Sequence, residues 1–461
     1  MDALPQTHWI VIDVRTAQEG VNSGVSRFVV GLASALTREL SAQSASNVES
    51  PLKILLVARQ HPPRWIVDLV RQFPQFVSFW SGGPGALTSR WNKPVYLWPT
   101  SVVKRIHQFT KGRFLWVAPA NFDRPLFVSR SKSGLTKDRL IQVIHDTIPF
   151  TQKSGMGFFF RQQFCFLVRR TLGRFPHVLT NSAFSARELK QLSQKRTFGV
   201  EVLRFGIEGI FGSVPRLVGR DSCKQTRFNF LKSTLGLDDD PSDLAILNKW
   251  ASMRWIVGVG RPQKYKNWDL ALETVASSQT LDSEGLLLLR VGYDPKETLK
   301  FGKSDHKAYG RALFNGQLSV LGFSGLSDDS LAMLYSLSDV LLHPSRAEGF
   351  GFPPVEAALS GLPVIYRAGT AVETHFSSNV FPKMFWHGID ADDVDAWRDA
   401  LKKVLAGDEE SKQFFGGMAL AKNPRTFIES VSRETWFRWS DSAKQFLEYI
   451  KTMSLTQEKT P

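Results

Sequence analysis

The sequence has only two cysteines among its 461 residues, Cys165 and Cys223, and no C-x-x-C pair or His/Cys cluster. This scarcity argues against a disulfide framework and a structural zinc site, and it is typical of a reducing compartment. No stretch approaches the ~20 uninterrupted apolar residues that a membrane-spanning helix needs. The first residues, MDALP, lack the basic and apolar regions of a secretory signal. We therefore expect a cytoplasmic protein.

Acidic residues are scarce in the first half of the chain. Residues 1–210 hold 28 Lys and Arg against 12 Asp and Glu, whereas the rest of the chain holds 30 against 31. The whole excess of positive charge, +15, therefore falls in the first half. A basic surface favours anionic partners such as acidic lipid headgroups, phosphorylated acceptors or nucleic acid. A solvated basic surface on a soluble enzyme is the simpler alternative.

Apolar runs of strand length alternate with segments of helical periodicity along most of the chain, as α/β proteins require. A length of 461 residues allows two or three domains with sizeable cores. Strands are predicted at 9–14, 52–58, 114–118, 140–144, 200–205, 254–260, 286–291, 318–321 and 340–342. Helices are predicted at 25–40, 185–192, 269–275, 331–336, 355–359, 394–405 and 433–450. For residues 60–115 the pattern supports few assignments.

The segment 341–365 holds the most informative pattern in the sequence. An apolar strand leads into a loop with Gly349 and Gly351, and two prolines follow where a helix would start. Such a strand, glycine loop and helix offer free N–H groups and a positive helix end to a phosphate. Two carboxylates, Glu348 and Glu356, lie beside this loop and are suited to accept from sugar or ribose hydroxyls. An ordinary strand-to-helix connection with two surface glutamates is the alternative.

The stretch from Glu348 to Glu356, EGFGFPPVE, resembles the E-x7-E signature of retaining GT-B glycosyltransferases of family 4. The residues that follow, with Gly361, Pro363 and Val364, resemble the G-x-PV of the same family. Three further elements are similar to family motifs: Gly24-Val-Ser-Arg-Phe, His145-Asp-Thr-Ile-Pro, and Gly260-Arg with Lys266-Asn. The second of these is typical of a bacterial branch that carries HD-x-IP. The resemblance covers most of the chain.

This resemblance implies the GT-B fold, in which two doubly wound Rossmann-like domains face each other across a cleft. We expect an acceptor-side domain over 1–210, a linker over 211–252 and a nucleotide-sugar-binding domain over 253–430. In the family a terminal helix commonly packs back on the first domain, and residues 431–452 are the candidate.

The resemblance also implies a metal-independent, retaining hexosyltransferase that moves a sugar from a UDP- or GDP-sugar to a glycan or lipid-linked acceptor, in surface polysaccharide assembly. Arg261 and Lys266 would bind the diphosphate and Glu356 the ribose. Glu348 would hold the sugar hydroxyls and His145 would meet the sugar from the other domain. The remaining candidates are Gly24, Gly349, Phe350, Gly351 and Phe352 at the donor phosphates, and Asp146 beside the histidine.

No cofactor or metal is expected, because two fixed cations can neutralise a leaving diphosphate. A nominal D-x-D pattern, Asp238-Asp-Asp240, lies in the predicted linker and away from any strand end. Two other classes remain open. One is a nucleotide-sugar-binding protein without turnover, and intact Glu348, Lys266 and His145 argue against it. The other is a nucleic-acid-binding protein, which the charge alone suggests and which no binding motif supports.

The segment from Gly157 to Phe175, GFFFRQQFCFLVRRTLGRF, combines aromatic and basic residues. As a helix it could place phenylalanines in a membrane interface with arginines at headgroup level, as a peripheral protein at the inner membrane face would. The same pattern fits a core helix whose arginines face water, which is the favoured interpretation.

Overall fold

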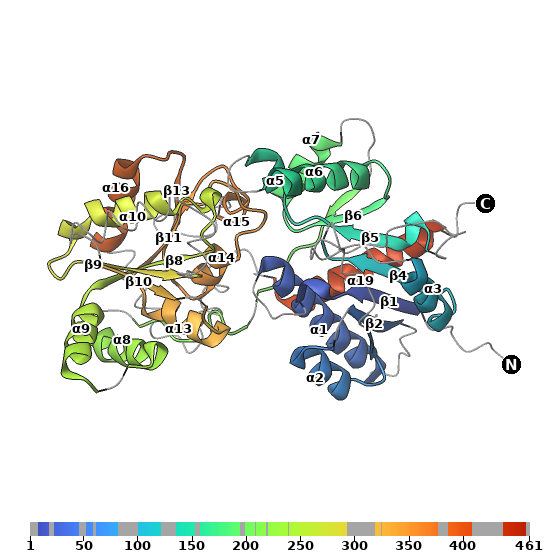
Figure 1. Cartoon of the computed structure of the whole chain (residues 1–461), viewed down its shortest axis with the longest axis horizontal. Coiled ribbons are helices and arrows are strands. Elements are labelled where there is room, and N and C mark those ends of the chain that lie inside the picture. Colours follow the sequence, from blue (N-terminus) through green and yellow to red (C-terminus); the bar gives the residue numbers. More distant parts are fainter. Residues whose placement is uncertain are drawn as a thin grey trace. The chain divides into compact units, whose positions relative to one another are not determined.

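The structure is a computed structural model of the whole chain (Figure 1). It describes residues 8–17, 23–45, 52–58, 61–81, 100–120, 135–152, 157–193, 199–207, 209–217, 220–237, 239–292, 319–323, 325–376, 386–407 and 437–457. The chain forms two compact units. The first comprises Met1–Phe150, Gly157–Glu208 and Phe437–Pro461, and the second Thr151–Met156 and Gly209–Trp436.

The first unit is built on a parallel sheet of seven described strands in the order β3-β2-β1-β4-β5-β6-β7. Its strands are β1 (His8–Asp13), β2 (Leu52–Ala58), β3 (Val77–Ser81), β4 (Phe114–Ala118), β5 (Leu140–Val143), β6 (His177–Thr180) and β7 (Val200–Val202). Its helices are α1 (Gly24–Ala45), α2 (Arg64–Gln72), α3 (Thr100–Phe109), α5 (Ile148–Thr151), α6 (Phe158–Leu172), α7 (Ala183–Leu192) and α19 (Trp439–Gln457), with short 3-10 turns η1 (Arg15–Ala17) and η2 (Lys137–Arg139).

The strands of this sheet are nearly continuous apolar runs because helices cover both faces of a parallel sheet. The side chains buried between this sheet and its helices include two apolar clusters. One packs α3 against the central strands, with Trp116 fully buried. The other packs α6 and α7 against β6 and β7, through residues such as Val168, Leu172 and Leu189. The strand order changes direction between β1 and β4, which is where open α/β sheets place their ligands.

The C-terminal helix α19 completes the first unit by packing on α1 and on the β7 edge. Gln445 donates to the Val202 carbonyl at 2.9 Å, and Ser442 donates to the Arg204 carbonyl at 2.8 Å. The indole of Trp439 lies so close to α1 that a Cβ on Gly31 would sit 2.2 Å from it. A glycine is therefore needed on α1 for the two helices to approach this closely.

The second unit has a parallel sheet of six described strands in the order β10-β9-β8-β11-β12-β13. Its strands are β8 (Arg254–Val259), β9 (Leu286–Val291), β10 (Ser319–Phe323), β11 (Val340–His343), β12 (Val364–Arg367) and β13 (Trp386–Ile389). Its helices are α8 (Arg220–Leu235), α9 (Pro241–Ser252), α10 (Trp268–Ser277), α13 (Asp328–Leu337), α14 (Phe352–Leu359), α15 (Glu373–Phe376) and α16 (Val394–Ala406), with 3-10 turns η3 (Lys264–Lys266) and η4 (Gln279–Leu281).

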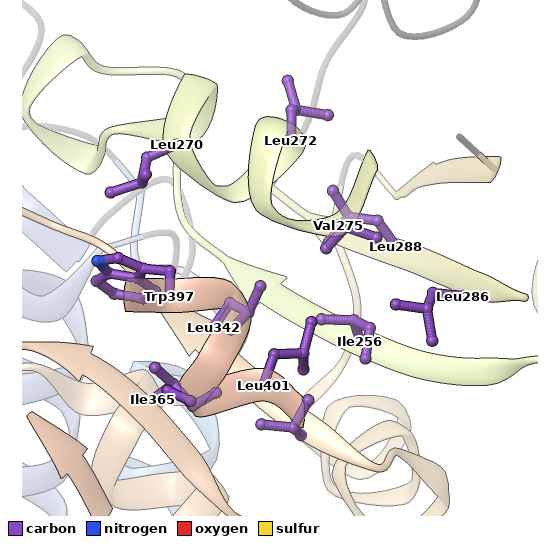
Figure 2. Packing of buried hydrophobic residues seen from close by; sticks show 12 residues of the cluster. Ile256, Leu270, Leu272, Val275, Leu286, Leu288, Leu342, Ile365, Trp397 and Leu401 are labelled. Atoms are coloured by element: carbon purple, nitrogen blue, oxygen red, sulfur yellow. The ribbon is translucent and has the colours of Figure 1, made fainter. Parts of the chain in front are cut away.

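A single apolar cluster holds α10 and α16 against this sheet (Figure 2). Ile256 and Leu342 contribute from the two central strands, and the indole of Trp397 from α16 is fully buried among them. Burying a side chain of this size contributes roughly 1.5–3 kcal/mol relative to leaving it exposed. The core therefore fixes β8 next to β11, and the sheet changes direction between these two strands.

The fold confirms the prediction of two doubly wound α/β domains. Most predicted elements are present with ends shifted by a few residues, and β9 spans the predicted residues. Residues 211–252, predicted as a linker, carry α8 and α9 and belong to the second unit. Asp240 of the nominal D-x-D pattern caps α9 by accepting from the Ser242 amide at 2.8 Å, which is a structural role. Residues 431–436 of the predicted terminal helix lie outside the described residues.

Candidate active site

The loop after β11 and the first turn of α14 form one edge of the candidate site. Gly351 precedes the helix with a φ of 86°, a left-handed conformation that favours glycine. A Cβ at this position would also lie 2.5 Å from a methyl of Val372. Pro353 and Pro354 begin the helix, where a missing N–H costs nothing. The glycine and the two prolines therefore favour a tight turn immediately before α14, close to the carboxyl end of β11.

A main-chain hydrogen bond brings together the loops that follow β8 and β11. The Arg346 amide donates to the Tyr265 carbonyl at 2.7 Å. Because β8 and β11 are neighbours at the point where the sheet order reverses, both loops leave the same edge of the sheet. This hydrogen bond between the two loops places Lys266 beside Glu348, although 82 residues separate them in the chain.

The carboxylate of Glu348 accepts two hydrogen bonds on the same oxygen. Lys266 Nζ donates to Oε1 at 2.6 Å, and His343 Nε2 lies 2.8 Å from that atom. All three side chains are largely buried: Glu348 is 9% exposed, Lys266 15% and His343 3%. Neither bond falls on Oε2, which leaves this oxygen without a donor from the described residues.

The charges in this cluster follow from burial and proximity. Burial alone would raise the pKa of Glu348, but the neighbouring Lys266 ammonium and the His343 hydrogen bond outweigh it and hold that pKa well below its usual range. Burial lowers the pKa of His343, and the attraction of Glu348 offsets only part of this effect. We therefore assign a carboxylate to Glu348 and a neutral imidazole to His343, with the proton on Nε2. The sequence interpretation did not single out His343.

A second carboxylate, Asp392, connects three loops at the same edge of the sheet. Arg346 donates to it at 2.7 Å, Arg367 at 3.0 Å and Asn267 at 3.1 Å. Asn267 directly follows Lys266 and has a left-handed φ of 56°, so this side chain also fixes an unusual backbone turn. Asp392 is thus a positioning residue for the loop that carries Lys266.

Arg261, the other predicted diphosphate ligand, lies in the loop after β8 and is exposed. Its carbonyl accepts from the Trp268 indole at 3.2 Å, which anchors the backbone of this loop to α10. Phe350 is buried, and its carbonyl accepts from His375 Nε2 at 2.9 Å. Phe352 is the first residue of α14 and packs on Phe350 at 4.8 Å between ring centroids. Gly349, Phe350, Gly351 and Phe352 therefore lead directly into the positive end of α14.

Glu356, predicted to hold a ribose, lies in the second turn of α14 and is only 1% exposed. The Tyr335 hydroxyl, from α13, donates to its Oε2 at 3.4 Å. Tyr335 lies within the predicted helix 331–336 and is fully buried. The sequence predicted that Tyr335 lies in a helix, but not that its hydroxyl contacts Glu356.

The loop after β12 also contacts the site. Glu373 accepts from the Gly369 amide at 2.8 Å, and His375 bonds to Phe350 as described above. The rings of His375 and Phe350 meet edge-on at 4.6 Å. His375 therefore holds the loop that contains Glu348, a role that the sequence interpretation missed because 25 residues separate the bonded pair.

His145 lies in the first unit, directly after β5. Its Nε2 lies 2.6 Å from the Pro119 carbonyl, and because a carbonyl can only accept, Nε2 carries the proton. Phe28 and Phe205 contact the ring edge-on at 5.3 and 5.4 Å. Burial lowers the pKa of His145 to about 4, and the bond to Pro119 opposes this only partly. The histidine is therefore neutral at pH 7, with Nδ1 as a hydrogen-bond acceptor.

The other two candidates in the first unit have local structural roles. Asp146 accepts from the Ile148 amide at 3.0 Å and so caps the short helix α5. Gly24 is the exposed first residue of α1, and next to it Ser23 and Ser26 bond reciprocally. Phe28 of the same motif contacts His145, so the start of α1 and the end of β5 meet.

Within the described residues no group of three or more His, Cys, Asp and Glu side chains could hold a metal ion. Of the helices described, none combines the length and the hydropathy that crossing a membrane requires.

Comparison with known proteins places these residues in a family context. The family described as "Glycosyl transferases group 1" matches residues 245–415, the stretch that contains Arg261, Lys266, Glu348 and Glu356. The D-inositol 3-phosphate glycosyltransferase of Corynebacterium urealyticum is 24% identical over 133 residues, which are 29% of this chain and 28% of that protein. The O-antigen chain mannosyltransferase RfbU of Salmonella typhimurium is 34% identical over 82 residues, 17% of this chain and 21% of that protein. The chain thus matches about a quarter of each relative's length.

Solved structures match almost the whole chain. The sucrose-phosphate synthase from Thermosynechococcus elongatus superimposes with a TM-score of 0.60 at 15% identity, covering 97% of this chain and 100% of that one. HepE from Anabaena, in complex with UDP and glucose, gives a TM-score of 0.61 at 14% identity over the same shares. The chain has the GT-B fold. At these identities the likeness establishes the fold and leaves activity to be inferred from the site.

Proposed function

We propose that this protein is a retaining glycosyltransferase that moves a sugar from a nucleoside diphosphate sugar to an acceptor hydroxyl. The observation that carries the proposal is the buried Lys266–Glu348 pair at the reversal point of the second sheet. A carboxylate suited to sugar hydroxyls and a cation suited to phosphate lie side by side there, next to the positive end of α14.

Lys266 and Arg261 are proposed to bind the diphosphate. In the transfer step the bond between the sugar C1 and the diphosphate oxygen breaks, and its electron pair stays on the diphosphate. The acceptor oxygen bonds to C1 on the same face, and its proton passes to a diphosphate oxygen. Cations fixed near the leaving group stabilise the charge that develops on it, and this is worth several kcal/mol in a site that excludes water.

Glu348 is proposed to accept from sugar hydroxyls through Oε2, because Lys266 and His343 already bond to Oε1. Glu356 is proposed to bind the ribose, in which case the Tyr335 hydroxyl fixes its carboxylate. His145 is proposed to accept from a sugar hydroxyl through Nδ1, since its Nε2 proton is committed to Pro119. A neutral histidine of this kind is a binding group and not a general base at pH 7.

The acceptor is proposed to be a glycan or a lipid-linked saccharide of surface polysaccharide assembly, and the reaction to need no added metal. The similarity to RfbU, an O-antigen chain mannosyltransferase, supports the first part. The presence of two cationic residues, Arg261 and Lys266, in the segment after β8 supports the second.

The first experiment is a thermal-shift screen against UDP, GDP and ADP, followed by turnover assays with sugars of whichever nucleotide stabilises the protein. We expect one nucleotide to raise the melting temperature and its sugars to be consumed in the presence of EDTA. Proton NMR of the product then reports the anomeric configuration. Binding without turnover for all acceptors would favour a non-catalytic sugar-nucleotide-binding protein, and an inverted product would refute retention.

A further inference from the structure

Helix α6 presents an unusual set of apolar side chains to solvent. Of the seven large hydrophobic residues exposed in the described part of the chain, four lie on this helix: Phe158 (64%), Phe159 (84%), Phe160 (46%) and Phe166 (59%). Single exposed apolar residues are common on soluble proteins and need no explanation. These four exposed phenylalanines lie within nine positions of one helix, and they are here named the α6 phenylalanine patch.

The patch is held outward by the packing of the opposite side of the helix. Val168 and Leu172 are buried in the cluster that joins α6 and α7 to β6 and β7. Arg161 also donates to the Pro149 carbonyl at 2.8 Å and ties the helix to α5. Because the buried side of α6 is already occupied by its own domain, the exposed phenylalanines do not complete that core. The structure confirms the interpretation of α6 as a core helix whose arginines face water, and it adds the exposed phenylalanines.

The sequence segment that contains the patch carries positive charge only. From residue 147 to residue 187 the sequence has six Lys and Arg and no Asp or Glu. Arg169 and Arg170 lie in the last turn of α6, and Arg174 follows directly after it. All three are exposed. This charge pattern is complementary to a surface of phosphates.

The apolar and basic residues are ordered along the helix axis. Phe159, Phe166 and Arg170 follow one another at seven and four positions, so they share one side of the helix. The guanidinium of Arg170 lies 6.0 Å from the centre of the Phe166 ring. From Phe159 to Arg170 the rise is ~16 Å at 1.5 Å per residue. The first turn is thus apolar and the last turn basic, a gradient that matches the boundary between acyl chains and headgroups.

From these observations we infer that the α6 phenylalanine patch is a docking surface for an anionic lipid bilayer. The first turn of α6 enters the acyl boundary, and Arg169, Arg170 and Arg174 contact the headgroup phosphates. Insertion of an amphipathic segment by ~5–10 Å is sufficient for such peripheral attachment. The inference is independent of the proposed transferase activity, because it concerns binding to lipid and not turnover.

The test is sedimentation of the full chain with vesicles of phosphatidylcholine alone or of phosphatidylcholine mixed with phosphatidylglycerol, at low and high salt. We expect binding to the anionic vesicles only. The double variant Phe159→Ser/Phe166→Ser should lower the vesicle affinity ~10-fold or more, since two aromatic rings lose their apolar environment. The double variant Arg170→Gln/Arg174→Gln should weaken binding and reduce its dependence on salt.

A matched control is available on the same domain. Phe109 of α3 is 55% exposed and lies outside the patch, so Phe109→Ser should leave vesicle binding unchanged. Wild-type protein that stays in the supernatant with anionic vesicles at low salt would overturn the inference. Unchanged binding by the Phe159/Phe166 variant would also overturn it. A lipid-free change in the oligomeric state of that variant, without loss of vesicle binding, would assign the patch to contact between copies instead.

Discussion

His343 Nε2 lies 2.8 Å from Oε1 of Glu348, the same oxygen that Lys266 contacts at 2.6 Å. His343 ends β11, so its ring position is fixed by the sheet, while Glu348 lies in the loop beyond it. A buried carboxylate between a rigid imidazole and a cation has little freedom to rotate. The geometry makes His343 a positioning residue for the proposed sugar contact.

Replacing His343 by alanine is expected to lower kcat ~10-fold, about 1.4 kcal/mol of transition-state stabilisation, with a smaller change in KM. The pKa of Glu348 should rise because the carboxylate loses a donor, so the acid limb of the kcat profile should move to higher pH. Steady-state kinetics across pH measure both effects. His343→Gln retains an amide donor and should recover part of the rate. An unmoved acid limb in His343→Ala would contradict the assignment.

Replacing Lys266 by alanine should reduce turnover by more than ~10-fold, because the leaving diphosphate loses a fixed cation. Lys264, an exposed lysine two residues away in the same 3-10 turn, provides the control. Initial rates at saturating donor distinguish the two variants. Full activity in Lys266→Ala would show that its role at the phosphate is wrong.

Glu356→Ala is expected to weaken nucleotide binding ~10-fold, measured by isothermal titration with the nucleotide that the thermal-shift screen selects. Tyr335→Phe should weaken it less, because only the hydroxyl that fixes the carboxylate is lost. The exposed Glu284 in the same unit serves as a control. If Glu356→Ala and Glu284→Ala bind nucleotide equally well, the ribose role of Glu356 is refuted.

Substitutions at Gly351 and Gly369 distinguish the cost of a left-handed backbone from the cost of steric overlap. Gly351 and Gly369 both have positive φ, 86° and 74°, but only at Gly351 would a Cβ meet a neighbour within 4 Å. Gly369→Ala should cost ~1–2 kcal/mol from the left-handed backbone alone. Gly351→Ala should cost ~1–3 kcal/mol more, since Val372 must move. Thermal melts of the two variants give the comparison, and equal melting temperatures would contradict the predicted overlap.

His145 is expected to stay uncharged well below neutral pH, because burial lowers its pKa to about 4. In the unfolded chain the same group has a pKa of about 6.5. The unfolded state therefore binds more protons between these values, and the contribution of this group to stability falls as pH decreases from 6.5 to 4. An NMR titration, with His145→Gln to assign the signal, should show no transition near pH 6.5. A midpoint there would exclude the buried, neutral state.

The sequence predicted the two sheets well, and it failed where long-range contacts decide. Continuous apolar runs such as Leu286–Val291 identify buried parallel strands without further information. The E-x7-E pattern located Glu348, but His343 as its partner depends on how the intervening loop folds back. His145 was singled out by its motif, whereas the Phe205 ring and the Pro119 carbonyl that set its charge come from distant segments. In 60–115, helices such as α2 span only 9 or 10 residues, shorter than the window over which periodicity identifies a helix.

The packing of α19 has a consequence for how the chain is made. Residues 1–208 leave the ribosome first, yet the groove between α1 and the β7 edge is filled only by Trp439 and the residues after it. Domains usually fold in the order of their synthesis. The first unit therefore cannot complete its packing until the second unit has been translated. Until then, the apolar side chains that α19 covers are exposed to solvent. Nascent chains stalled before Trp439 should therefore be the species that depends most on chaperones.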